Sequence, residues 1–291
     1  MLFLNQFING LHLGSIYALI ALGYTMVYGI VRLINFAHGD IIMIGAYVSL
    51  VMISSLKTEP LLALLVSVLV CTLVGVLIER VAYKPLRNSP RISALITAIG
   101  VSYMLENLAQ ILFSSDPKPF PSVFPNRSIL GGELNIGLLT LVTIGSAGLL
   151  MLILRFVVYG TKTGKAMRAV SEDLLAARLM GVNVNKTISI TFAIGSALAG
   201  FGSFLYASAY PVVYPYMGMN PGLKAFIAAV LGGIGSVPGA MVGGFIMGVV
   251  EAFAKAFISS QLADAVVYGI LILVLLLKPS GILGKPMIEK V

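Results

Sequence analysis

Long apolar stretches, separated by short polar ones, run the whole length of the chain. The apolar runs fall at about 7–31, 40–56, 61–78, 93–113, 136–158, 187–208, 222–235, 238–257 and 262–277. About 20 apolar residues in a helix cross the hydrocarbon core of a bilayer. The pattern therefore predicts an all-α polytopic membrane protein with about nine transmembrane helices, eight to ten being the range. The run at 222–235 is short, and half-helices broken around 232–239 fit it nearly as well as a crossing.

The charged residues between the runs predict an orientation. Lys and Arg gather at 80–91, 162–186 and 278–290, whereas 114–135 is Pro-rich and weakly charged. Since basic loops stay in the cytoplasm, we expect the N-terminus outside and the C-terminus in the cytoplasm. The same argument accounts for the formal net charge of +8, so no nucleic-acid partner is predicted.

Residues 159–186 form the longest polar stretch inside the apolar chain. Ser171 is a suitable N-cap for a short helix, and Glu172 and Asp173 would then lie in its first turn, where the helix dipole favours carboxylates. Gly181 is placed to end this helix as a C′ residue. We therefore predict a helix from about Glu172 to Met180.

The predicted helix has an apolar edge formed by Leu175, Leu179 and Val182, with the small Ala176 and Ala177 beside it. Such a helix can sit in a groove of another protein. It can equally lie on lipid headgroups. The spacing leaves both alternatives open.

Ionisable and amide side chains inside apolar runs are costly and are candidates for function. Glu106, with Asn107 beside it, has no basic neighbour in its own run, so it either pairs with another helix or faces a polar path. Glu251 and Lys255 are one helical turn apart, which favours a neutralising pair.

Three further polar residues lie near the ends of apolar runs. Lys224 and Asp264 are expected simply to meet water or a helix terminus. Asn35 belongs to a polar turn between the first two runs, where it can satisfy exposed backbone groups.

Glycines recur at four-residue spacing in two places, which predicts close helix packing. They are Gly10 and Gly14 in the first run, and Gly235, Gly239 and Gly243, with Gly244 and Gly248, later on. The two stretches also share a Gly-Leu start and Ala- and Leu-rich turns, which weakly suggests an internal duplication.

The sequence offers no set of residues for catalysis. Residues 160–166 come closest to a phosphate-binding loop, but the run is one residue too short and has Ala166 where a hydroxyl is needed. We therefore predict no ATPase site. His12, His38 and Cys71 are far apart in the sequence, so no metal site or other cofactor is predicted.

Several motifs resemble one family, and together they cover essentially the whole chain. Residues 23–29, 34–40, 164–170 and 229–240 resemble the signature segments of permease subunits of branched-chain amino-acid importers of the ATP-binding-cassette class. Residues 175–181 resemble the Glu-Ala-Ala-x-x-x-Gly loop with which such permeases dock on their ATPases, with Leu175 in place of the Glu.

The resemblance implies a single transmembrane permease domain over 1–291, with a cytoplasmic coupling loop at 159–186, in the bacterial cytoplasmic (inner) membrane. Its implied partners are a second, homologous permease, two cytoplasmic ATPase subunits, an extracytoplasmic amino-acid-binding protein and membrane lipid. The residues expected to couple to the ATPase are Gly164, Lys165, Arg168, Glu172, Ala176, Ala177 and Gly181. The residues expected along the substrate path are Asn35, Glu106, Asn107 and Glu251.

Two other classes of function remain to be weighed. A secondary transporter or channel for amino acids, urea or short amides would need intramembrane ionisable groups for ion coupling, and only Glu106 and Glu251 are available. A membrane-embedded enzyme would need the catalytic set that is missing.

Overall fold

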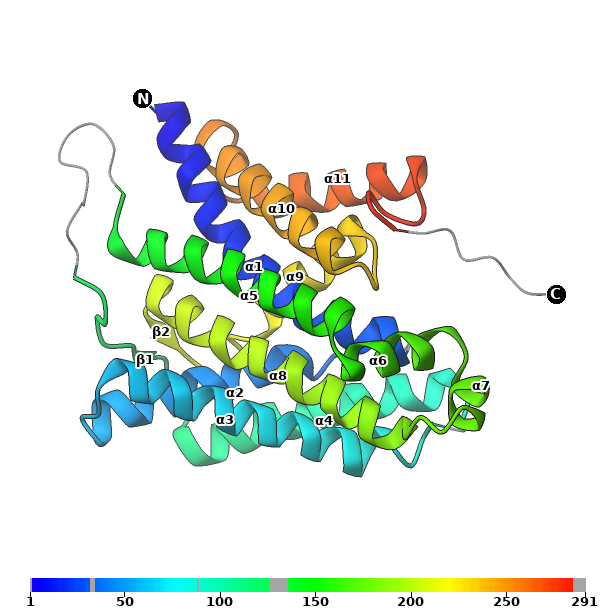
Figure 1. The fold of residues 1–291 in the computed structure, drawn as a ribbon. Coiled ribbons are helices and arrows are strands. Elements are labelled where there is room, and N and C mark those ends of the chain that lie inside the picture. The colour runs from blue at the N-terminus through cyan, green and yellow to red at the C-terminus, as the bar shows by residue number, and fades with distance from the viewer. Residues whose placement is uncertain (1, 32–34, 88, 126–135, 285–291) are drawn as a thin grey trace.

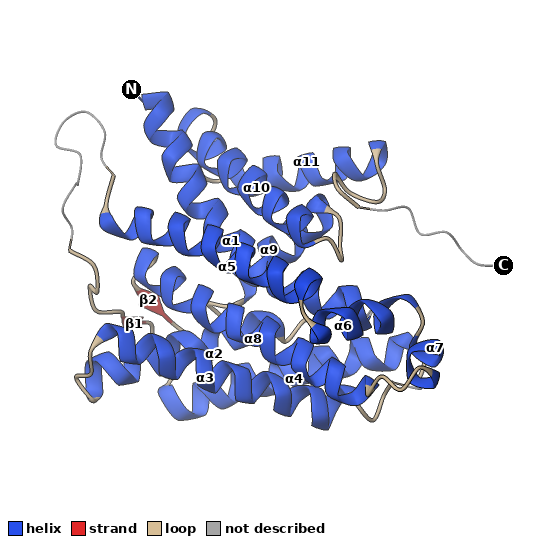
Figure 2. Ribbon diagram, viewed as in Figure 1, coloured by secondary structure: helices blue, strands red, loops and turns tan. Residues whose placement is uncertain are grey.

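The computed structural model describes residues 2–31, 35–87, 89–125 and 136–284, and these form a bundle of helices (Figures 1 and 2). The basic residues Lys285 and Lys290 of the predicted tail, and the end of the loop at 114–135, lie outside the described residues. In chain order the elements are α1 (Leu2–Val31), α2 (His38–Leu50), η1 (Val51–Ser55), α3 (Pro60–Ile78), η2 (Glu79–Tyr83), α4 (Arg91–Phe113), β1 (Lys118–Pro119), α5 (Leu138–Gly160), α6 (Lys162–Glu172), α7 (Leu174–Leu179), α8 (Val184–Ala209), β2 (Val212–Val213), α9 (Met219–Gly232), α10 (Val237–Phe257) and α11 (Ala263–Leu277).

Seven helices of the described chain are long and apolar enough to cross a membrane. The segments η1 and η2 are π-helical turns that continue α2 and α3, and with them the two helices reach 18 and 24 residues. The other two apolar helices are shorter, since α9 has 14 residues and α11 has 15. A polytopic helical membrane protein is confirmed, whereas nine crossings stay a prediction.

Helices α2 and α9 both begin inside the bundle. His38, the first residue of α2, packs against Tyr24, with ring centroids 4.4 Å apart. Tyr24 lies seven residues before the end of α1, about 10 Å along the helix at 1.5 Å per residue. A Cβ on Gly39 would lie 2.8 Å from the carbonyl oxygen of Gly218, directly before α9. The starts of α2 and α9 therefore meet within the bundle.

The contacts arrange α1–α4 and α8–α11 as two units of the same plan. The first helix of each unit packs along the third helix of the other, α1 on α10 and α8 on α3. The second helices cross over likewise, α9 to α1 and α2 to α8. Figure 1 shows that α1 and α8 start at opposite ends of the bundle. The units are therefore inverted relative to each other, as in many transporters.

Gly10 and Gly14 of α1 lie with Gly244 and Gly248 of α10 at one of these crossings. A Cβ on Gly248 would approach the Gly14 backbone to 2.1 Å, and a Cβ on Gly10 would approach the Val249 backbone to 2.6 Å. Close packing is confirmed. The weak suggestion of an internal duplication between the two stretches stays a prediction.

Helix α3 buries a stripe of small residues against α8 and turns large ones outward. Ala63, Ser67, Cys71 and Gly75 are buried, while Leu61, Leu65, Leu69, Leu73 and Leu77 are each about three-fifths exposed. Small residues let helices approach closely in a membrane, where burying Leu gains nothing over lipid. The leucine face is thus the one that lipid or another membrane helix would cover.

The two ends of the bundle differ. At one end β1 pairs with β2 in an antiparallel ladder, with Lys118 opposite Val213 and Pro119 opposite Val212. At the other end lie α6, α7, the start of α8 and the C-terminal end of α11 (Figure 1). We call these the strand end and the α7 end.

Candidate functional site

The polar stretch 159–186 forms two helices rather than one. Thr161 caps α6, since its hydroxyl accepts a 3.0 Å hydrogen bond from the amide of Gly164. Ser171 and Glu172 are the last residues of α6, and the extended backbone of Asp173 then separates α6 from α7. The prediction of Ser171 as the N-cap and of a helix beginning at Glu172 is therefore wrong.

Asp173 is the N-cap of α7. Its carboxylate accepts hydrogen bonds from the amides of Leu175 and Ala176 at 2.8 and 2.9 Å. A carboxylate at this position satisfies exposed amides and faces the positive end of the helix dipole. The helix therefore starts with a side-chain N-cap as expected, but at Asp173, two residues later than predicted.

Gly181 ends α7 as predicted. Its φ is +82°, a conformation that glycine adopts without steric cost. The amide of Gly181 bonds to the carbonyl of Arg178, and the amide of Val182 to that of Ala177, each at 3.0 Å. This is the Schellman pattern of a C-terminal cap.

The side chains of α7 and of the residues after it divide into an outward and an inward set. Leu175, Leu179 and Met180 are 68%, 88% and 84% exposed. Ala177 is only 4% exposed, and Val182 packs against the core of the protein. The apolar edge is confirmed for Leu175 and Leu179, but Val182 and Ala177 face the protein's own body. Ala176 and Gly181 are exposed.

The predicted coupling residues of α6 have different surroundings. Gly164 is buried, and a Cβ there would lie 2.2 Å from the carbonyl oxygens of Val157 and Val158, so this glycine lets α6 fold back on the end of α5. Lys165 and Glu172 are exposed. The Arg168 guanidinium, also exposed, lies 5.2 Å from the centre of the Tyr159 ring.

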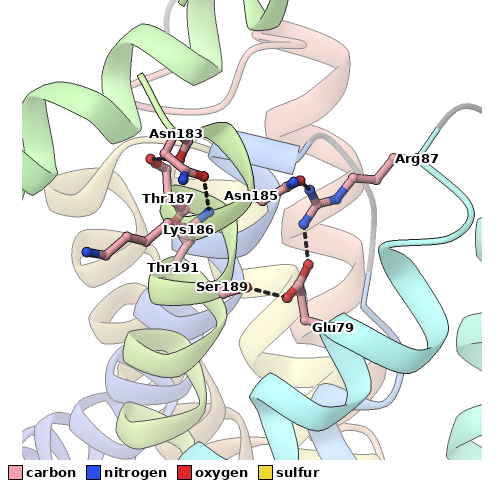
Figure 3. Close-up of polar contacts among 8 residues, drawn as sticks. All are labelled: Glu79, Arg87, Asn183, Asn185, Lys186, Thr187, Ser189 and Thr191. Atoms are coloured by element: carbon pink, nitrogen blue, oxygen red, sulfur yellow. Dashed lines mark hydrogen bonds and ion pairs between the residues drawn. The ribbon is translucent and has the colours of Figure 1, made fainter. Parts of the chain in front are cut away.

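Next to α7, a buried ionic network joins the end of α3 to the start of α8 (Figure 3). Arg87 makes a salt bridge to Glu79, whose side chain is fully buried. Arg87 also donates a 2.5 Å hydrogen bond to the Asn185 side chain, and the Ser189 hydroxyl donates one of 2.6 Å to Glu79. Because Asn185 and Ser189 lie in the first two turns of α8, the network clamps the loop after α3 onto that helix.

Asn35, a predicted path residue, is held by the same part of the chain. The hydroxyl of Tyr83, at the end of η2, donates a 2.9 Å hydrogen bond to the Asn35 side chain. Both residues are 2% exposed. The carbonyl of Asn35 in turn accepts a 3.1 Å hydrogen bond from the amide of His38, where α2 begins.

Glu106 is buried next to a second carboxylate. It is 6% exposed on α4, and it lies within electrostatic range of Asp40 in the first turn of α2, which is 3% exposed. Ser102 is within hydrogen-bonding reach of Asp40. The neighbouring Asn107 is exposed and donates a 2.7 Å hydrogen bond to the carbonyl of Tyr103 on its own helix.

Glu251 is the centre of another ionic network, near the strand end. It lies 2.6 Å from Lys255, as predicted, and 2.8 Å from Lys224, and it accepts a 2.9 Å hydrogen bond from Tyr17. Lys224 also lies 2.7 Å from Asp264. The expectation that these two residues merely meet water or a helix terminus is wrong for Lys224, which joins α9 to α10 and α11. Asp264 does lie in the first turn of α11 and is half-exposed, but it also pairs with Lys224.

The four predicted path residues thus lie in three separate places. Sequence reasoning did not single out Glu79, Arg87 or Tyr17, although each belongs to a buried polar contact. An acidic residue at the end of an apolar run, followed by basic residues, was the available signal for Glu79.

A family model for the permease component of branched-chain amino acid transport systems matches residues 6–276. The chain belongs to this family. Its resemblance in the signature segments is therefore confirmed over nearly the whole length.

Curated relatives extend the likeness to both ends. The chain is 44% identical over 305 aligned positions to the high-affinity branched-chain amino acid transport system permease protein BraD of Pseudomonas aeruginosa, covering 99% of this chain and 98% of the relative. It is 45% identical to the similarly named LivH of Escherichia coli (strain K12), with the same coverage. A probable LivH of Methanocaldococcus jannaschii is 33% identical over 198 positions, which are 64% of this chain and 60% of that protein. No solved structure matches the chain.

Proposed function

We propose that this protein is the permease subunit of an ATP-driven importer that carries branched-chain amino acids across the bacterial cytoplasmic membrane. It works with a second, homologous permease, two cytoplasmic ATPase subunits and an extracytoplasmic binding protein. It has no ATPase site of its own. The α7 end faces the cytoplasm, and α7, with exposed residues of α6, is the surface that docks on an ATPase.

The exposed apolar edge of α7 is the observation that supports this proposal best. Leu179 and Met180 are more than four-fifths exposed. The helix α7 is six residues long and is capped at both ends, so these side chains are held in a defined position. Apolar side chains held outward on a short, well-defined helix suit a hydrophobic groove in a partner. Basic residues on neighbouring α6, Lys165 and Arg168, would lie at the polar rim of that contact.

The secondary-transporter alternative has less support from the interior charges. Glu251 is neutralised by two lysines rather than left to exchange an ion with solvent. Glu106 and Asp40 are the remaining candidates for ion coupling. Whether transport requires ATP distinguishes this alternative from the proposed function.

The docking surface can be tested with Leu179→Ser in the complete complex. The side chain points outward, so the permease should reach normal levels in the membrane, whereas recovery of ATPase subunits with the permease should fall about tenfold or more, as for loss of an apolar anchor in an interface. Leu61→Ser, on the outward face of α3, is the matched control and should leave ATPase recovery unchanged. Full recovery of the ATPase with Leu179→Ser would contradict docking through α7.

A further inference from the structure

The contacts of η2 form a continuous connection between the docking segment and the middle of the bundle. We infer that Glu79, Arg87 and Tyr83 are positioning residues that transmit displacement of α7 to the start of α2. The inference rests on the proposed function, because it concerns how the docked ATPase would act on the permease.

The first part of the connection is the short joint between α7 and α8. Only four residues, Met180 to Asn183, separate the two helices. The Asn183 side chain caps α8 by accepting a 3.0 Å hydrogen bond from the amide of Lys186, and its carbonyl accepts one of 2.9 Å from the hydroxyl of Thr187. Val184 is buried. Since both sides of the joint are capped and anchored, α7 cannot shift far without moving the first turns of α8.

The second part is the clamp between α8 and η2. Asn185 holds Arg87, and Ser189 and Arg87 both hold Glu79 (Figure 3). Glu79 is fully buried, and the side chain of Arg87 is 14% exposed. A buried carboxylate that loses its partners is strongly unfavourable. The clamp therefore has one preferred arrangement, and η2 should follow the start of α8.

The third part leads from η2 to the middle of the bundle. Glu79 and Tyr83 are the first and last residues of this π-helical segment, and such irregular turns are often found at functional sites. Tyr83 holds Asn35, and the Asn35 carbonyl holds the amide of His38 at the start of α2. A displacement at η2 thus reaches the point where α2 meets the residues that lead into α9.

The test uses the complete complex and measures substrate uptake per ATP hydrolysed. Tyr83→Phe removes one hydroxyl and keeps the ring, and the double variant Glu79→Met, Arg87→Met replaces a buried ion pair by apolar side chains, a change that proteins often tolerate. In both variants ATPase recovery with the permease should stay normal, and uptake per ATP should fall at least about fivefold, the lower end of ordinary coupling between two sites. Tyr103→Phe and Arg80→Gln, exposed positions on α4 and η2, are the matched controls.

The outcomes separate this inference from the proposed function. Normal uptake per ATP in both Tyr83→Phe and the double variant would overturn the inference while leaving docking intact. Loss of ATPase recovery in these variants would also overturn it, since the residues would then act on assembly. Failure of the unchanged permease to bind any ATPase would instead refute the proposed function.

Discussion

Lys224 of the half-helix α9 lies 2.8 Å from Glu251 of α10, and both side chains are nearly inaccessible to solvent. The contact attaches α9, with 14 residues, to α10, which is long enough to span a bilayer. Tyr17, Lys255 and Asp264 complete the network from three sides.

We expect Glu251→Gln to lower the free energy of unfolding by about 3–5 kcal/mol, because Lys224 and Lys255 would lose their shared carboxylate inside the bundle. Lys255→Gln should cost about 1 kcal/mol or less, since its side chain is 39% exposed. Unfolding of the purified permease in detergent measures both. Equal effects of the two substitutions would show that burial does not decide the strength of this network.

Ala177→Trp should damage the seat of α7 rather than its outer surface. Ala177 is 4% exposed, and forcing a large ring into a packed site costs about 1–3 kcal/mol or more. We expect α7 to become accessible to limited proteolysis and ATPase recovery to fall as a consequence. Ala176→Trp, on the exposed side, is the comparison, and it should leave the protease resistance of α7 unchanged while impairing docking. Protease resistance of the Ala177 variant equal to that of the unchanged protein would contradict the assigned orientation of α7.

Gly181→Val should weaken the cap of α7 through the backbone alone. No atom lies within 4 Å of a Cβ built at Gly181, so the cost comes from its positive φ and should be about 1–2 kcal/mol. Gly181→Asn should cost less, because Asn tolerates this conformation better. Resistance to proteolysis at 173–183 and recovery of the ATPase should both decrease in the order Gly, Asn, Val at position 181. If the Val variant resisted the protease as well as the Asn variant does, backbone strain would not be the cause of the weaker cap.

The proposed orientation can be tested by labelling single cysteines in a Cys71→Ala background. Cysteines replacing Lys84, Lys165 and Pro279, all exposed, should react with membrane-impermeant reagents only from the cytoplasmic side. A cysteine replacing Ser115, near the strand end, should react only from outside. Labelling of the Pro279 position from outside would change the number of crossings by one.

Glu106→Gln tests whether the two neighbouring carboxylates serve transport. The substitution keeps the shape of the side chain and removes its charge, so the complex should assemble normally. We expect uptake to fall, since an intramembrane carboxylate that faces Asp40 and has no described basic contact is costly to keep for structure alone. Uptake equal to that of the unchanged permease would assign Glu106 a purely structural role.

Hydropathy and charge correctly predicted a polytopic helical membrane protein, but they could not show where within the bundle each helix begins. The apolar runs locate the helices, yet nothing in the composition of residues 38–50 or 219–232 reveals that α2 and α9 begin inside the bundle. That arrangement depends on Gly39 and Gly218 packing backbone to backbone. In α3 the four-residue recurrence of small side chains did carry the information, because it identifies the face that packs on α8.

Local chemistry was predictable where it depended on neighbours in the sequence. Gly181 and the Glu251–Lys255 pair are examples. The pairing of Lys224 with Glu251 joins residues 27 positions apart, and no periodicity shows it. Ala177 lies nearly opposite Leu175 and Leu179 on any α-helix of 3.6 residues per turn, so its inward face followed from the predicted apolar edge and was missed.

The meeting of α2 and α9 has a consequence for the charge balance inside the bundle. Each helix start carries about half a unit of positive charge. Two buried carboxylates lie in this region, Asp40 in the first turn of α2 and Glu106 on α4. The two helix starts therefore offset part of this negative charge and lower the electrostatic cost of keeping both carboxylates away from water.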